Sequence, residues 1–289
     1  MSRRALLIYG VTPRSGTNYL HDLLALHPDA EPSDFVYEAG LNLFADELER
    51  YARSLTGFWN RWVEQDIPTQ AVLQALGQGL LDLIGQDLDP ERLMLTKTPY
   101  PRNIGLAPQL FPDAHLLIIV RSPTAVVASS VRTWGSDVAA AASRWATGAR
   151  EILRFCDQHA DTKVIKYEDL VEDPAAVVRT GLAEVGLPAN SFPFDGVSAL
   201  PVRGSSAIAS DSPVTWHPVD RPADFDPADR GTELGERNRD TVAAVVGGLP
   251  SEFGYEALPR PALARRLTAR GRVTAYSAAD RLSLTPSKL

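Results

Sequence analysis

Short apolar runs constrain this chain more than any other feature of its sequence. They are ALLIYG at 5–10, RLMLTK at 92–97 and HLLIIVR at 115–121, and KVIKYEDL at 163–170 indicates a further strand. Continuous apolar runs of this length are typical of strands that are buried on both faces of a sheet. We therefore expect a sheet that is covered by helices on both sides.

Helical patterns fill the segments between these runs. Apolar residues recur at three- and four-residue spacing in 19–28, 69–86, 124–132, 137–158, 175–185 and 234–246. Strands that alternate with helices indicate βαβ units and a parallel sheet, so the predicted fold class is α/β. The Pro-, Ser- and Asp-rich segment 188–227 lacks this periodicity, and a loop of such length is usually functional or mobile.

Length and charge suggest how the chain is organised. We predict one domain at 1–257 and a basic tail at 258–289, because 289 residues suit a single large core. The net charge of −7 argues against general nucleic-acid binding, yet the tail carries seven basic residues against Asp280 alone. The tail could dock on an acidic partner, dock on the acidic body, or merely be solvated, and we favour the last two.

Several absences bear on location and metal binding. The apolar runs are too short for a transmembrane helix, and the N-terminus lacks the pattern of a signal peptide, so we expect a cytoplasmic protein. Cys156 is the single cysteine and excludes an internal disulfide. The five histidines show no metal-ligand spacing, and we predict no metal site.

A phosphate-binding turn lies between the first strand and the first helix. The segment GVTPRSGTN at 10–18 would point backbone N–H groups and a helix N-terminus at an anion. It departs from the Walker A pattern, because five residues separate Gly10 from Gly16 and the only cation is Arg14. The strand at 115–121 ends in Arg121 rather than in a carboxylate for Mg²⁺. Side chains, rather than magnesium, are therefore expected to neutralise the phosphate.

Two segments resemble the sulfotransferases that use 3′-phosphoadenosine 5′-phosphosulfate (PAPS). PRSGTNYL at 13–20 looks like their 5′-phosphosulfate loop in its Arg form, and VRSPTAVVASS at 120–130 looks like their 3′-phosphate motif. Ser129 follows Arg121 by eight residues, which places its hydroxyl two helical turns on, folded back over the strand end. The likeness is closer to the protein-tyrosine and bacterial members than to the animal cytosolic enzymes, and it implies a P-loop-like sulfotransferase fold.

The resemblance also implies which residues would bind the nucleotide. Tyr167 in KYEDL would approach the adenine, and Tyr19 stands where the animal cytosolic enzymes carry a stacking Trp. PVRGSS at 201–206 looks like the late loop that closes over the 3′-phosphate. The full predicted set for the nucleotide is Arg14, Ser15, Gly16, Thr17, Asn18, Tyr19, Arg121, Ser129, Tyr167, Arg203, Gly204 and Ser205.

The expected reaction assigns catalytic roles to three residues. Negative charge grows on the bridging oxygen of the leaving nucleotide, and Arg14 would stabilise it together with Lys97 of LTKTPYPRNI, which resembles the family's transition-state lysine segment. Lys97 could instead be a surface lysine. The predicted general base is Glu38, which follows the aromatic stretch at 35–37. Glu38 could equally be a solvated helix residue.

Alternatives for the base and for the acceptor pocket stay open. Glu31 lies 17 residues after Arg14 and Glu38 lies 24 after it, neither at the family's usual offset of some twenty, and His217 is a weaker choice. Five aromatic residues cluster within 19 positions, and we favour a core role over an apolar acceptor site for them. They are Phe44, Tyr51, Phe58, Trp59 and Trp62.

The predicted function is transfer of a sulfuryl group from PAPS to a hydroxyl of a small-molecule or metabolite acceptor, giving PAP, the desulfated nucleotide, and a sulfate ester. A nucleotide kinase that uses ATP and Mg²⁺ is the first alternative, and the absent Walker lysine and the Arg121 strand end count against it. A non-catalytic PAP-binding protein is the second. The sequence leaves a homodimer open.

Overall fold

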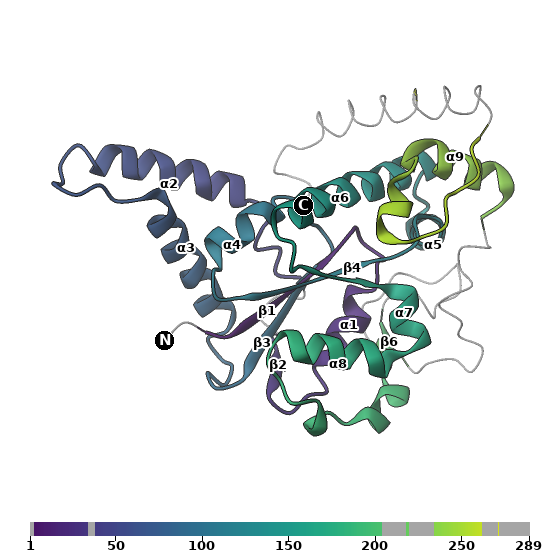
Figure 1. Cartoon of the computed structure of the whole chain (residues 1–289), viewed down its shortest axis with the longest axis horizontal. Coiled ribbons are helices and arrows are strands. Elements are labelled where there is room, and N and C mark those ends of the chain that lie inside the picture. The colour runs from purple at the N-terminus through teal and green to yellow at the C-terminus, as the bar shows by residue number, and fades with distance from the viewer. Residues whose placement is uncertain (1–2, 34–37, 204–217, 220–233, 262–270, 272–289) are drawn as a thin grey trace.

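The chain forms the predicted α/β fold around a five-stranded parallel sheet (Figure 1). The computed structural model describes residues 3–33, 38–203, 218–219, 234–261 and 271. The strand order is β2-β3-β1-β4-β5, and every neighbouring pair is parallel. The strands are β1 (Ala5–Gly10), β2 (Ala30–Pro32), β3 (Leu93–Thr98), β4 (His115–Val120) and β5 (Lys163–Lys166). All residues of the central strands β1 and β3 are buried, as their continuous apolar runs predict.

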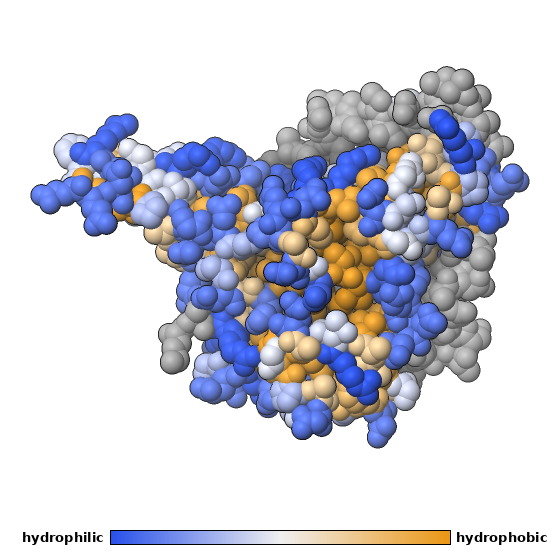
Figure 2. Space-filling model, viewed as in Figure 1, coloured by the Kyte–Doolittle hydropathy of each residue, from blue (hydrophilic) through white to orange (hydrophobic). Residues whose placement is uncertain are grey.

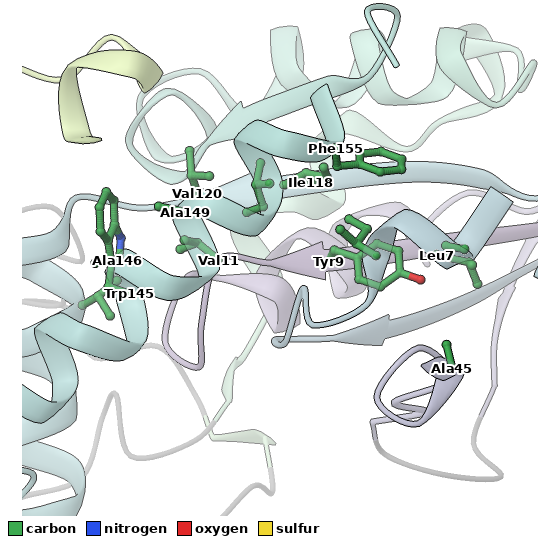
Figure 3. Packing of buried hydrophobic residues seen from close by; sticks show 14 of the residues in the cluster. Leu7, Tyr9, Val11, Ala45, Ile118, Val120, Trp145, Ala146, Ala149 and Phe155 are labelled. Carbon is green, nitrogen blue, oxygen red and sulfur yellow. The ribbon is translucent and has the colours of Figure 1, made fainter. Parts of the chain in front are cut away.

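Helices cover both faces of the sheet. One face carries α1 (Thr17–Leu24), α7 (Tyr167–Glu172) and α8 (Pro174–Glu184). The other carries α3 (Thr69–Ile84), α4 (Ala107–Leu110), α5 (Pro123–Trp134), α6 (Val138–Gln158) and α9 (Glu236–Val246). Side chains alternate along β1, so that Leu6 and Ile8 join the first core and Leu7 and Tyr9 join the second. Figure 3 shows the second core between the sheet and α6.

Helix α6 approaches the sheet closely where β1 ends. A Cβ atom on Gly148 would lie 1.8 Å from the carbonyl oxygen of Val11, so only glycine fits there. The Val11 N–H donates to the carbonyl of Ile119 at 3.1 Å. Together these contacts fix the start of the phosphate-binding turn against β4 and α6.

The structure corrects the predicted strand at 163–170. The strand ends at Lys166, and Tyr167 begins helix α7. Glu168 and Asp169 occupy the first turn of this helix, where negative side chains are favourable to the helix dipole. The sequence pattern also missed β2, which has only three residues, and α2 (Ala45–Trp59).

The segment after α8 is less irregular than its composition suggests. It contains the short 3-10 helices η2 (Ala189–Ser191) and η3 (Phe194–Ala199) and an antiparallel pair of β6 (Val202–Arg203) and β7 (Pro218–Val219). Further 3-10 helices are η1 (Ile104–Leu106) and η6 (Leu249–Phe253). Throughout the described ranges, no helix is long and apolar enough to cross a membrane.

The aromatic cluster contradicts the core role that we favoured from sequence. Helix α2 and the start of α3 project from the body as an arm at the left of Figure 1, and the rest of α3 packs on the sheet. The rings lie mostly on its surface, with exposed fractions of 53% for Phe44, 56% for Tyr51, 55% for Phe58, 38% for Trp59 and 77% for Trp62. Small residues of α2, Ala45 and Ala52, are buried in their place.

Candidate active site

The predicted phosphate loop joins β1 to α1 with two left-handed residues. Arg14 has φ 78° and Gly16, which precedes the first residue of α1, has φ 100°. The Ser15 hydroxyl donates to the carbonyl oxygen of Thr12, and it accepts from the Thr12 N–H at 3.3 Å. The Ser15 side chain therefore closes the loop on itself. The N–H groups of the first turn of α1 lie at the positive end of the helix dipole, where an anion is favoured.

Tight packing explains the two glycines of the loop. A Cβ atom on Gly16 would lie 2.2 Å from Cδ2 of Tyr167, so the ring lies directly against the loop backbone. A Cβ atom on Gly10 would lie 2.7 Å from Oγ of Ser15 and 2.8 Å from Cγ2 of Thr17. Gly10 is the last residue of β1, and Gly16, which is one of the residues predicted to bind the nucleotide, directly precedes α1.

The two predicted anion-binding motifs meet in space. Nε of Arg14 donates to Oγ of Ser129 at 3.0 Å, and Nη1 of Arg121 donates to the carbonyl oxygen of Arg14 at 3.3 Å. Ser129 is fully buried in α5, two turns from the end of β4. Two guanidinium groups and a hydroxyl therefore lie together at one end of the sheet, an arrangement suited to a phosphate group.

Aromatic side chains flank these arginines. The guanidinium carbon of Arg121 lies 4.3 Å from the ring centroid of Tyr167, and that of Arg14 lies 5.7 Å from the ring of Trp134. Tyr19 on α1 meets Tyr167 edge to face, with 6.5 Å between the ring centroids. The two tyrosines that we predicted to contact the adenine are thus neighbours.

Lys97 is a buried residue of β3 and not a surface lysine. It pairs with Ile8 of β1 in the register of the sheet, and only 5% of it is exposed. The N–H of Ala39 donates to the Lys97 carbonyl at 3.1 Å, which brings the segment containing Glu38 beside β3. Lys97 therefore lies close to the end of β1, from which the phosphate loop begins.

Glu38 lies in a bend and not in a helix, and its carboxyl group interacts electrostatically with Lys97. Glu38 is exposed as a residue, yet partial desolvation of its carboxyl group raises its pKa, while the positive charge of Lys97 acts in the opposite direction. Desolvation also raises the pKa of Tyr100, and the negative charge of Glu38 adds to that effect. The predicted base and the predicted catalytic lysine are thus brought together.

Other predicted residues are placed differently or not described. The carboxylate of Glu31 accepts from the Asp89 N–H at 3.1 Å, so this alternative base already has a structural role. The backbone of Arg203 lies in β6. Gly204, Ser205 and His217 lie outside the described residues. Oδ1 of Asn18 is buried and has no hydrogen-bond partner in the described part of the chain.

Three contacts that support the site were not found from sequence. Nε1 of the buried Trp145 donates to the Arg121 carbonyl at 2.9 Å. The carboxylate of Glu168 accepts from the Ser122 N–H at 3.0 Å and from the Tyr255 hydroxyl at 2.7 Å. Burial and the charge of Glu168 raise the pKa of Tyr255, so this phenol stays protonated. The one sequence signal for these contacts was that Glu168 directly follows Tyr167, which was predicted to bind the nucleotide.

Known proteins resemble this chain in sequence. A family model described as the sulfotransferase family matches residues 6–191. Protein-tyrosine sulfotransferase 1 of Danio rerio is 26% identical over 195 residues, covering 64% of this chain and 54% of that protein. Nodulation protein NoeE of Sinorhizobium fredii is 25% identical over 296 residues, covering 84% of this chain and 64% of that protein. The chain thus spans less than two thirds of the length of these curated relatives.

Solved structures share the fold. The sulfotransferase from Alicyclobacillus acidocaldarius superposes with a TM-score of 0.52 at 18% identity, covering 92% of this chain and 100% of that one. Sulfotransferase STF9 from Mycobacterium avium superposes with a TM-score of 0.52 at 16% identity, covering 90% of this chain and 79% of that one. At this level of identity the likeness concerns the fold alone.

Proposed function

Because this chain belongs to the sulfotransferase family, as its motifs predicted, we propose that it transfers a sulfuryl group from PAPS to a hydroxyl of an acceptor. The products are PAP and a sulfate ester. The observation that carries the proposal is the convergence of Arg14, Arg121 and Ser129 at the end of β1 and β4. The proposed catalytic domain is 1–257, and the tail at 258–289 and the cytoplasmic location stay predictions.

The residues present fit a nucleotide with phosphates at both ends. Arg121 and Ser129 offer a charged donor and a hydroxyl to the 3′-phosphate, and the first turn of α1 offers N–H groups to the 5′-phosphosulfate. Gly16 keeps the loop free of a side chain where Tyr167 packs against it. The buried, unpartnered Oδ1 of Asn18 lies on the same turn of α1. Tyr19 and Tyr167 offer aromatic surface to the adenine.

The chain's own groups would carry the steps of the reaction. When bound, PAPS supplies the sulfuryl group and a phosphate leaving group. Arg14 and Lys97 provide fixed positive charge for the negative charge that develops on the leaving nucleotide. Preorganised charge of this kind lowers the barrier to transfer. Glu38 accepts the proton of the acceptor hydroxyl, and its raised pKa makes it a stronger base than an ordinary glutamate.

A small-molecule or metabolite hydroxyl is the acceptor that we propose first. A tyrosine side chain of a protein is the second candidate, because two relatives are named protein-tyrosine sulfotransferases. The negative charge of Glu38 acts on the phenol of Tyr100, so the proposed base already influences one tyrosine side chain. Competition between tyrosine peptides and small hydroxylated compounds for labelled sulfate separates the two candidates.

Calorimetric titration of the full chain with PAP in EDTA, beside ATP with Mg²⁺, tests the proposal. We expect PAP to bind without metal and ATP to bind weakly. Binding of ATP that needs Mg²⁺, with PAP ignored, would support a kinase and overturn the proposal. PAP binding without transfer of labelled sulfate to any acceptor in a broad screen would favour a non-catalytic PAP-binding protein.

A further inference from the structure

Helix α2 and the turn after it carry an apolar stripe at coiled-coil spacing. Its members follow one another at alternating intervals of four and three residues, the spacing of a helix-packing seam. They are Phe44, Leu48, Tyr51, Leu55, Phe58 and Trp62. Trp62 continues the stripe beyond the helix, because its N–H donates to the Trp59 carbonyl at 2.8 Å.

The aromatic members of the stripe face away from the rest of the arm. Ala45, Ala52 and Thr56 lie on the side of α2 that is buried, and Oγ1 of Thr56 lies 3.1 Å from Oγ1 of Thr69 in α3. Leu48 and Leu55 are half-buried at the border between the two sides. The rings stay exposed, and in Figure 2 pale and orange patches interrupt the hydrophilic surface of the arm.

The exposed area is large for a surface that meets only water. Phe44, Tyr51, Phe58 and Trp62 together expose about 500 Å², since an aromatic side chain offers roughly 150–250 Å². A patch of this size matches the largest that monomers usually tolerate, about 300–600 Å². Leu48 and Leu55 already pack partly against the core of their own copy, so residues that flank the rings would supply most of the remainder of the roughly 800 Å² per partner of a standard interface.

We propose that two copies of this chain pair through this stripe, with their α2 helices antiparallel about a twofold axis. Such a pairing places Tyr51 against Leu55 of the second copy and Phe44 against its Trp62. The surface is then self-complementary, which is the property of an interface in a twofold dimer.

Charge determines the antiparallel direction. By its spacing Glu47 falls on the outer flank of the stripe, and so does Arg61 if the stripe is continued into the turn after α2, while the inner flank contains the buried Ala45 and Ala52. In an antiparallel pair the outer flanks meet, so Glu47 of one copy faces Arg61 of the other. In a parallel pair Glu47 would meet the inner flank, which offers no basic residue. Glu47 also forms an ion pair with Arg50 on its own helix at 2.6 Å. A change at Glu47 would disturb that pair as well, so Arg61 is the better first position to change.

Sedimentation velocity of the full chain over a wide concentration range is the first test. We expect a dimer whose dissociation constant rises by at least about tenfold in Phe58→Glu, because the variant introduces a charge into the seam. Leu83→Glu is the matched control, since Leu83 is a similarly exposed (49%) apolar residue of α3 outside the stripe. Circular dichroism verifies that both variants fold.

Charge reversal tests the direction. Arg61→Glu and Glu47→Arg should each weaken the dimer, and the double variant should recover most of the loss. A chain that stays monomeric at all concentrations overturns the proposal, and so does a dimer that is unaffected by Phe58→Glu. Monomers that co-sediment with lipid vesicles through these rings would also overturn it, because the stripe would then contact a membrane.

Discussion

Arg14 donates a hydrogen bond from Nε to the hydroxyl of Ser129, 3.0 Å away. Sequence motifs assigned the two residues to opposite ends of the nucleotide, one to the 5′-phosphosulfate and one to the 3′-phosphate. In the fold they belong to one cluster at the end of β1 and β4. The Ser129 hydroxyl accepts this bond and keeps its own hydrogen to donate, so an anion that binds Ser129 also lies next to Arg14, which couples the two motifs.

Loss of either predicted 3′-phosphate ligand should weaken PAP binding. Hydrogen bonds to charged groups contribute about 1.5–3 kcal/mol each, so Arg121→Ala and Ser129→Ala should each lower the affinity by roughly 10- to 100-fold. Calorimetric titration with PAP measures the change. Ser130→Ala, at the neighbouring buried serine of α5, is the control and should bind PAP normally. Unchanged affinity in both Arg121→Ala and Ser129→Ala would contradict the proposed nucleotide site.

Glu38→Gln should abolish turnover and leave PAP affinity unchanged, because the amide cannot accept the acceptor's proton. The proton-accepting form of Glu38 is the carboxylate, so the rate of the wild type should fall as the pH drops through its pKa. Desolvation raises this pKa, and the acidic limb should therefore lie above the range of an ordinary glutamate. A pH–rate profile locates the limb. If Glu38→Gln remains active, the base lies elsewhere.

Lys97→Gln should reduce turnover by roughly 10²–10³, the usual effect of removing one preorganised charge or donor. It should also move the acidic limb upward, because the charge of Lys97 lowers the pKa of Glu38. The exposed Lys163 provides the control variant Lys163→Gln. A slower enzyme whose pH–rate profile keeps its acidic limb at the same pH would mean that Lys97 and Glu38 do not interact during the reaction.

Gly16→Ala should damage both the loop and the nucleotide site. The left-handed backbone at φ 100° disfavours a side chain by about 1–3 kcal/mol, and the new methyl group would collide with Tyr167. We expect a lower melting temperature and weaker PAP binding, measured by thermal unfolding and titration. Gly105→Ala is the matched control, because a Cβ atom there meets nothing within 4 Å. Equal behaviour of the two variants would show that Tyr167 does not pack on the loop.

Local patterns were sufficient for most of the fold. The continuous apolar runs predicted the strands β1, β3 and β4, because a strand between two helical layers needs apolar side chains on both faces. The local patterns failed at Tyr167, which both begins a helix and packs on the phosphate loop. Tyr167 looks like part of a strand, yet it begins α7 and packs on Gly16.

The aromatic cluster shows where composition misleads. Burial was the expected state of five large rings, and the structure buries the small residues Ala45, Ala52 and Thr56 of α2 instead. The heptad spacing of the rings was present in the sequence. Which side of the helix meets α3 depends on packing between segments distant in the chain.

The sequence by itself determined the parallel α/β class, the phosphate loop after β1 and the residue types that could bind two phosphates, because these depend on neighbours along the chain. Tertiary structure alone decided that Arg14 reaches Ser129, that Lys97 is buried beside Ile8 and that Glu38 lies within its electrostatic reach. Those relationships join residues from separate strands and helices. Their distances follow from how the sheet orders its strands, and no local spacing in the sequence encodes that order.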